Sequence, residues 1–162
     1  MYCYAYKENT VKLEQKIPPL LLTFLFAGFM KLISFITPSF NLNFPFALEL
    51  CFLFIVLGIS FALAGVYSFK KHKTTVNPVS TDNVSTLVNT GIFGYTRNPM
   101  YVGMFTTLLG YALLLSNPIN LLILIMFILY MNKYQITPEE TFLTSTFGNE
   151  YVAYKNNVKR WL

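Results

Sequence analysis

Long apolar stretches alternate with polar segments along the chain. The apolar stretches cover residues 17–36, 44–69, 101–115 and 118–136. A helix needs about 20 residues to cross the roughly 30 Å of bilayer hydrocarbon, and in lipid a helix satisfies its backbone groups within its own segment. The third stretch is shorter, but Pro99 and Met100 can extend it. The pattern therefore predicts an all-α integral membrane protein with about four transmembrane helices.

Prolines mark the expected helix starts. Pro18-Pro19 and Asn117-Pro118 stand where the first and fourth apolar stretches begin, and a helix tolerates a missing N–H donor there. Thr137-Pro138-Glu139-Glu140 has the pattern of an N-cap, a proline at the first helical position and acidic residues in the first turn. We therefore expect the fourth span to end near Ile136 and a new helix to begin there.

The segment after the fourth span is amphipathic. Apolar and aromatic residues recur at helical spacing as far as Val158, and Gly148 interrupts them; they are Phe142, Leu143, Phe147, Tyr151 and Tyr154. A helix with one apolar face suits the surface of a membrane. We expect a cytoplasmic C-terminal amphipathic helix that covers whatever the loop before the third span binds.

Composition excludes a soluble domain. Hydrophobic residues make up 54% of the 162 residues and charged residues only 12%, whereas soluble proteins have about 25% charged residues. The length predicts one membrane domain over residues 1–162. We divide it into a tail (1–16), a two-helix scaffold (17–69) and a part that carries the chemistry (70–162). The first stretch is too long for a signal-peptide core, so we interpret it as a retained anchor.

Positive charge marks one side of the membrane. Eleven of the twelve basic residues lie in the two tails and in the loop between the second and third stretches, and the short loops 37–43 and 116–117 carry none. The positive-inside rule makes the basic side cytoplasmic, with both termini inside. The net charge of +5 follows from this distribution. Since no basic stripe interleaves with exposed aromatic residues, we expect no nucleic-acid partner.

Four residues with reactive or charged side chains have ordinary structural explanations. Lys31 and Glu49 fall at similar depth in two helices that we expect to be antiparallel neighbours. An ion pair, or contact with the nearby interface, explains them better than a proton relay or a substrate anchor. Cys3 and Cys51 lack CxxC spacing and histidine partners, so we interpret both as free thiols. We expect no metal site.

Two polar segments are the candidates for function. The loop of residues 70–98 is too long for an idle connector, has Gly91 where the backbone needs freedom, and ends at Asn98-Pro99, where the third span begins. The unpaired amides and positive dipole end at that helix start could hold a carboxylate. Glu139 and Glu140 are the second candidate. They allow two interpretations, compensation of a helix dipole or participation in a site.

A series of short motifs runs through both candidates. A Leu-Val pair with Gly and an aromatic residue precedes an Arg-Asn-Pro-x-Tyr element, and a Glu-Glu pair precedes a Phe-Gly-x-x-Tyr-x-x-Tyr tail; the residues are Leu87, Val88, Gly91, Phe93, Arg97, Asn98, Pro99, Tyr101, Glu139, Glu140, Leu143, Phe147, Gly148, Tyr151 and Tyr154. In these elements and their order, the chain from about Thr74 to its C-terminus resembles the isoprenylcysteine carboxyl methyltransferase and phospholipid methyltransferase group of integral membrane enzymes.

The resemblance implies a membrane methyltransferase that uses S-adenosyl-L-methionine, here a multi-pass protein of bacterial type in the inner membrane. By position, the implied cofactor contacts are Ser85, Thr86, Leu87, Val88, Phe93, Asn98, Pro99, Met100, Tyr101 and Glu139. The implied catalytic residues are Arg97, Tyr101 and Glu140, and Gln135 is the implied substrate-binding residue. The expected partners are membrane lipids and a lipid-like or prenylated small acceptor whose carboxylate receives the methyl group.

Two positions depart from the eukaryotic members of that group, and two alternatives stay open. Asn98 stands in place of a His, and Gln135 in place of an Arg that contacts the substrate carboxylate. Gln cannot form a bidentate ion pair, so methylation of a prenylcysteine carboxylate is in doubt. A sterol-reductase-like enzyme with NADPH has a similar C-terminal pattern, but a 2′-phosphate favours more basic residues than Arg97 and Lys133. A non-catalytic membrane protein on the same frame is the other alternative.

Overall fold

The chain folds as a bundle of helices. The computed structural model describes residues 17–42, 44–71 and 86–162. The elements, in chain order, are the helices α1 (Pro19–Ile36), α2 (Ala47–Lys71), α3 (Pro99–Leu115), α4 (Ile119–Met131), α5 (Thr137–Phe147) and α6 (Asn149–Asn157), the 3-10 turns η1 (Pro38–Phe40) and η3 (Gly91–Gly94), and the π-helical turn η4 (Asn132–Ile136). The four predicted apolar stretches each form a helix, which confirms the all-α prediction.

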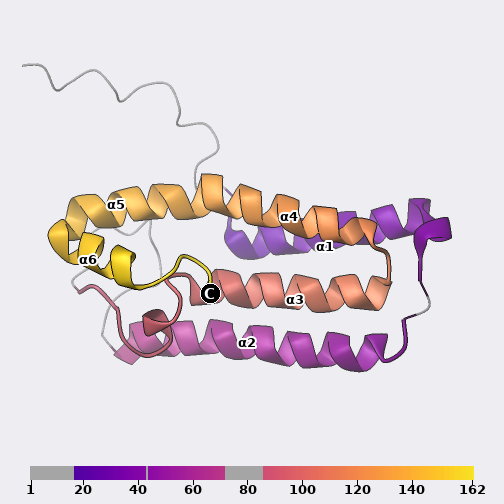
Figure 1. Cartoon of the computed structure of the whole chain (residues 1–162), viewed down its shortest axis with the longest axis horizontal. Helices are drawn as coiled ribbons and strands as arrows, with labels where there is room; N and C mark the ends of the chain where they lie inside the picture. Colours follow the sequence, from indigo (N-terminus) through magenta and orange to yellow (C-terminus); the bar gives the residue numbers. More distant parts are fainter. Residues whose placement is uncertain (1–16, 43, 72–85) are drawn as a thin grey trace, which may run out of the picture.

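Helix α3 is the centre of the bundle. It lies between α2 on one side and α1 and α4 on the other (Figure 1). Glycines bring α2 and α3 close together, because a Cβ atom on Gly58 would meet the Gly103 carbonyl oxygen at 2.5 Å and one on Gly110 would meet Phe54 Cβ at 2.7 Å. On its other side α3 contributes Tyr101, Leu108 and Ala112 to the apolar core that it shares with α1 and α4.

Within the residues that the structure describes, three helices are long and apolar enough to cross a membrane. They are α1, α2 and the continuous helix of 29 residues formed by α4, η4 and α5. Helix α3, with 17 residues, is a shorter apolar helix. Large apolar side chains remain exposed on the outer faces of the long helices, for example Phe35, Phe52 and Leu122. Lipid covers such a surface at no cost, whereas water does not. The protein is therefore an all-α membrane protein.

The expected break between the fourth span and the next helix is wrong. Thr137 has a helical backbone and is no N-cap, and its N–H donates to Asn132 O, five residues back. Its hydroxyl donates to the same oxygen at 2.7 Å. Pro138 has no N–H to donate and would break a regular α-helix. The wider π-helical turn directly before it lets the helix continue past the proline. α4 therefore runs on into α5, and carries Glu139 and Glu140 on the same rod.

The chain turns back after α5. Gly148 has φ +54°, a left-handed backbone that suits glycine, and α6 starts at the next residue. The predicted interruption at Gly148 is thus confirmed. Figure 1 shows α6 and the C-terminal residues returning from the end of α5 toward the start of α3. We call this end of the bundle, where α2 ends and α3 begins, the α6 end.

Of the two structural explanations for Lys31 and Glu49, the ion pair does not form. Because α3 lies between α1 and α2, these two helices are not the neighbours that we expected. Both side chains are exposed, and every ion pair within the described ranges involves Glu140 instead. Glu49 lies in the first turn of α2, where a carboxylate stabilises the helix dipole. The structural explanation of both residues stands without an ion pair.

Candidate functional site

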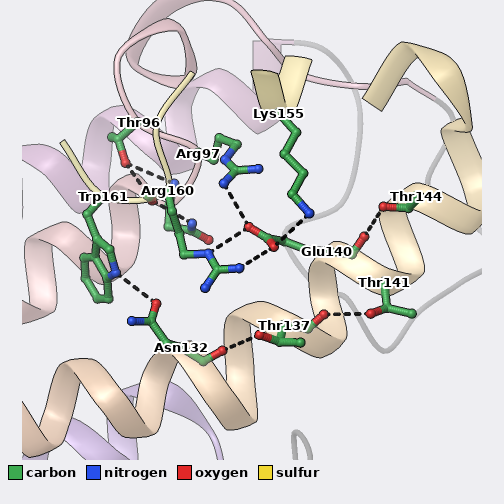
Figure 2. A network of polar contacts seen from close by, with 11 residues as sticks. Thr96, Arg97, Asn132, Thr137, Glu140, Thr141, Thr144, Lys155, Arg160 and Trp161 are labelled. Carbon is green, nitrogen blue, oxygen red and sulfur yellow. Dashed lines mark hydrogen bonds and ion pairs between the residues drawn. The ribbon is translucent and has the colours of Figure 1, made fainter. Parts of the chain in front are cut away.

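A buried carboxylate lies at the centre of the α6 end. Glu140, on α5, has a side chain only 7% exposed and pairs with three cations (Figure 2). Arg160 binds it with two donors, Nε to Oε1 at 3.0 Å and Nη2 to Oε2 at 2.6 Å. Arg97 Nη2 lies 3.1 Å from Oε1 and Lys155 Nζ lies 3.5 Å from Oε2. We call these four residues the Glu140 cluster. It joins α5, α6, the C-terminus and the segment before α3.

Arg97 is the buried cation of the Glu140 cluster. Its side chain is only 9% exposed, whereas those of Arg160 and Lys155 are 32% and 44% exposed. Its Nε and Nη1 atoms are buried and make no hydrogen bond to the described part of the chain. Buried donors are normally satisfied. A guanidinium with two free, buried N–H groups next to other cations is a fitting partner for an anionic group of a ligand.

Glu139 faces a different partner from its neighbour. Tyr101, in the first turn of α3, donates a hydrogen bond from its hydroxyl to Glu139 Oε1. The contact joins residues 38 positions apart in the sequence. Glu139 and Glu140 thus both connect α5 to the start of α3, one through Tyr101 and the other through Arg97. The interpretation of the pair as mere dipole compensation misses these contacts.

Apolar and aromatic residues form one wall of the α6 end. Leu87, Tyr151 and Tyr154 are buried against one another, with Leu143, Phe147 and Val158 packed around them. Phe93, in η3, is buried, and its ring lies 5.0 Å from the Phe69 ring at an edge-on angle. The Tyr154 hydroxyl donates to the Phe93 carbonyl oxygen at 2.7 Å. α6 therefore packs on the segment 87–93.

The remaining predicted cofactor contacts lie at or near the start of α3. Val88 is buried, whereas Thr86 is exposed. Pro99 and Met100 pack against α2, where their side chains would lie 3.2 Å from a Cβ atom on Gly65. The Asn98 side-chain amide donates to the Arg160 carbonyl oxygen at 2.8 Å. Ser85 lies outside the described residues. Apart from Ser85, the structure brings these positions to the α6 end.

Gln135, the predicted substrate contact, lies on the π-helical turn. It is buried, and its Nε2 donates to the Ile17 carbonyl oxygen at 3.0 Å, directly before α1. Its side chain therefore holds the beginning of α1 against the fourth span.

The C-terminal residues are the part of the site that sequence reasoning missed. We call Lys159–Trp161 the C-terminal strap. Arg97 N donates to the Lys159 carbonyl oxygen at 3.0 Å, and Trp161 Nε1 donates to Asn132 Oδ1 at 3.0 Å. In the sequence, Arg160 had only the signal of a basic residue on the cytoplasmic side. Its pairing with a carboxylate 20 residues away depends on the reversal of the chain at Gly148.

The fold and the site together define a class of protein, a helical membrane protein with a charged site at one end of its bundle. The chain belongs to the phospholipid methyltransferase family, whose model matches residues 46–150. That range contains α2 to α5 and the first residues of α6. The family is one of membrane methyltransferases, which agrees with the resemblance that the motifs carry.

Individual relatives include proteins of stated activity. The chain is 32% identical over 133 residues to a Saccharomyces cerevisiae protein-S-isoprenylcysteine O-methyltransferase, and this covers 77% of the chain and 54% of that protein. It is 39% identical over 72 residues to the Schizosaccharomyces pombe protein of the same name, with 44% and 30% covered. The chain thus spans about half or less of these relatives. It is also 48% identical over 63 residues to an uncharacterized Haemophilus influenzae protein, of which it covers 100%. No solved structure matches the chain.

Proposed function

We propose that this protein transfers a methyl group from S-adenosyl-L-methionine to the carboxylate of a lipid-like acceptor. The observation that carries the proposal is the meeting of the two motif segments, 97–101 and 139–140, through the Tyr101–Glu139 and Arg97–Glu140 contacts. Membership of the methyltransferase family and the activity in the names of the two yeast relatives support it.

The residues at the α6 end fit the cofactor. The buried Nε and Nη1 of Arg97 have no hydrogen-bond partner among residues 17–42, 44–71 and 86–162, and they suit a carboxylate. Glu139 is a carboxylate that accepts from Tyr101 through one oxygen. Its remaining acceptor sites can pair with an ammonium group or accept from ribose hydroxyls. Leu87, Val88 and Phe93 are apolar side chains that can pack around an adenine. The carboxylate, the ammonium or ribose, and the adenine of the cofactor therefore each have a residue of matching chemistry.

When bound, S-adenosyl-L-methionine would supply an activated methyl group, because a carboxylate oxygen can bond to the methyl carbon as the C–S bond breaks and S-adenosylhomocysteine leaves as a neutral thioether. The chain's part is to bind and align, which by itself removes much of a barrier between two reactants. A carboxylate acceptor is already ionised at neutral pH and needs no base. Burial and the charge of Glu140 raise the pKa of Tyr151 to about 12. Tyr151 therefore stays a neutral phenol near pH 7 and does not act as a general base in the proposed reaction.

The acceptor enters from the bilayer in this proposal. The outer faces of the spanning helices are apolar, so an amphiphile can lie against them and bring its polar end to the α6 end. The proposed acceptor is a prenylated-cysteine-like molecule or a lipid. Arg97, Tyr101 and Glu140 are the proposed catalytic residues, with Gln135 beside the acceptor. The α6 end faces the cytoplasm of a bacterial inner membrane, and residues 17–69 serve as the scaffold for the methyltransferase core in 70–162.

Calorimetry on the purified protein tests the proposal. We expect S-adenosyl-L-methionine and S-adenosylhomocysteine to bind, and Glu139→Ala to weaken binding by about 1–3 kcal/mol, the range for a lost charge-assisted hydrogen bond. Glu150→Ala is the matched control, because Glu150 is an exposed carboxylate in the first turn of α6. Equal affinity of wild type and Glu139→Ala removes Glu139 from the site. Binding of NADPH without either sulfur compound contradicts the methyltransferase assignment.

A further inference from the structure

The C-terminal strap contacts three successive residues at the start of α3. Thr96 Oγ1 donates to the Arg160 carbonyl oxygen at 3.4 Å, Arg97 N donates to the Lys159 carbonyl oxygen at 3.0 Å, and Asn98 Nδ2 donates to the Arg160 carbonyl oxygen at 2.8 Å. Figure 2 shows this segment beside Thr96 and Arg97. The strap thus holds both the backbone and the side chains that lead into α3.

The side chain of Arg160 reaches the same carboxylate oxygen as Arg97. Glu140 Oε1 accepts from Arg160 Nε at 3.0 Å and lies 3.1 Å from Arg97 Nη2. Arg160 also holds Oε2, so it fixes both oxygens of Glu140 at once. A bidentate arginine sets the plane of a carboxylate, which a single-donor cation cannot do. The position of Glu140, and with it that of Arg97, therefore depends on Arg160.

We propose that Arg160 is a positioning residue, which orients Arg97 for the anionic group of a ligand through the shared carboxylate of Glu140. The inference rests on the proposed function and adds a residue to it. Arg97 is buried and uses Nη2 for Glu140, whereas its Nε and Nη1 have no partner in the part of the chain that the structure describes and can donate to a ligand. A turn of the Glu140 carboxylate moves the guanidinium and misaligns those two donors.

Trp161 provides a signal for the docking of the strap. It is the only tryptophan in the chain. Its Nε1 donates to Asn132 Oδ1 at 3.0 Å, and its ring lies 6.3 Å from the Phe105 ring. Release of the strap exposes the indole to water, so the emission maximum moves to longer wavelength and acrylamide quenching increases. Docking and ligand binding can therefore be measured separately in the same sample.

The experiment compares Arg160→Gln, Arg160→Lys and Lys159→Gln in purified protein. Lys159→Gln is the matched control, because it removes the same charge from an exposed side chain of the strap and keeps the backbone contact to Arg97. We expect Arg160→Gln to weaken S-adenosylhomocysteine binding roughly tenfold, with Arg160→Lys in between and Lys159→Gln within about twofold of wild type. A shift of the Trp161 emission maximum to longer wavelength identifies any variant in which the C-terminal strap is no longer docked.

A second background separates positioning from general support of the fold. In Arg97→Lys, which keeps the charge but lacks the guanidinium fork, a positioning role leaves Arg160→Gln with little further effect on affinity. The same roughly tenfold loss in both backgrounds overturns the proposal, and so does an Arg160→Gln affinity equal to that of Lys159→Gln. A wild-type protein that binds neither sulfur compound rejects the proposed function itself, and the role of Arg160 with it.

Discussion

Glu140 balances a buried positive charge. Arg97 is nearly as buried as Glu140, and a buried charge is expensive unless an opposite charge and hydrogen bonds compensate it. Arg160 and Lys155 lie at the more exposed side of the same carboxylate. The Glu140 cluster therefore carries one carboxylate for three cations. The excess positive charge of the cluster favours an anionic ligand. Because Glu140 is the one carboxylate of the cluster, its loss leaves the buried charge of Arg97 uncompensated there.

Glu140→Gln should lower the free energy of unfolding by about 3 kcal/mol, since removal of one partner leaves a buried cation uncompensated. Glu150→Gln, which changes an exposed carboxylate on α6, should have almost no effect. Denaturant unfolding in detergent, followed by the Trp161 emission, measures both. A Glu140→Gln protein as stable as Glu150→Gln would mean that Arg97 finds another partner.

Single residues were predictable where a local motif carries them. Tyr101 and Glu139 follow from short motifs, and the two side chains meet. Arg160 could not be found in this way, because its role comes from a reversal of the chain and not from a pattern around residue 160. The possible ion pair between Lys31 and Glu49 could not be decided from the sequence for a similar reason. Their similar depth in two helices does not reveal that α3 lies between those helices.

At the scale of elements, α2 and α3 are held together by close backbone approach. A Cβ atom on Gly58 would collide with the Thr107 hydroxyl, and one on Gly103 would collide with the Gly58 carbonyl oxygen. Small residues allow such contacts in membranes, where helices gain little from hydrophobic burial against each other. This contact carries the start of α3, and with it Arg97 and Tyr101, at a fixed place beside α2.

Gly58→Ala should therefore lower the free energy of unfolding by about 1–3 kcal/mol, the usual cost of overpacking. Gly28→Ala is the matched control, because a Cβ atom there has open space in the same type of membrane helix. Alanine favours a helix over glycine by about 1 kcal/mol, so Gly28→Ala should be neutral or stabilising. Thermal unfolding in one detergent compares the two. Equal destabilisation would contradict the close contact of α2 and α3.

The extents of α1 and α2 were predictable from hydrophobicity alone, because a membrane imposes the length of an apolar helix. The start of α5 was not. Thr137-Pro138-Glu139-Glu140 has every local signal of a helix N-terminus, yet the helix continues through η4. A local capping motif does not end a helix when the preceding helix can continue through it. Here a π-helical turn lets α4 continue past Pro138 into α5.

At the scale of the whole molecule, the two ends of the bundle differ in chemistry. The α6 end carries the charged cluster. The other end is tied by neutral groups, since Asn117 Nδ2 donates to Thr37 Oγ1 at 3.0 Å and to Asn41 Oδ1 at 2.8 Å. This difference agrees with the charge distribution along the chain, from which the cytoplasmic side was predicted.

Cysteine labelling tests that orientation. Ser39 lies exposed in η1, and Asn156 lies exposed on α6 at the opposite end of the bundle. In intact cells, with Cys3 and Cys51 replaced by alanine, a membrane-impermeant maleimide should label Ser39→Cys at once and Asn156→Cys only after permeabilisation. The reverse pattern would mean that the topology is inverted. Labelling of both positions in intact cells would contradict a bundle whose two ends lie on opposite sides of the membrane.

The unbroken rod of α4, η4 and α5 determines how far along the bundle Glu139 and Glu140 lie. Its 29 residues measure about 43 Å at 1.5 Å per residue. Glu139 stands about 30 Å from Ile119, which is the thickness of the hydrocarbon layer. With Ile119 at the opposite boundary of the hydrocarbon and the rod along the membrane normal, Glu139 and Glu140 lie at the boundary between acyl chains and headgroups. The proposed acceptor can then present its carboxylate at that depth without leaving its leaflet, whereas an acceptor with its carboxylate on a long polar extension places it beyond these two residues.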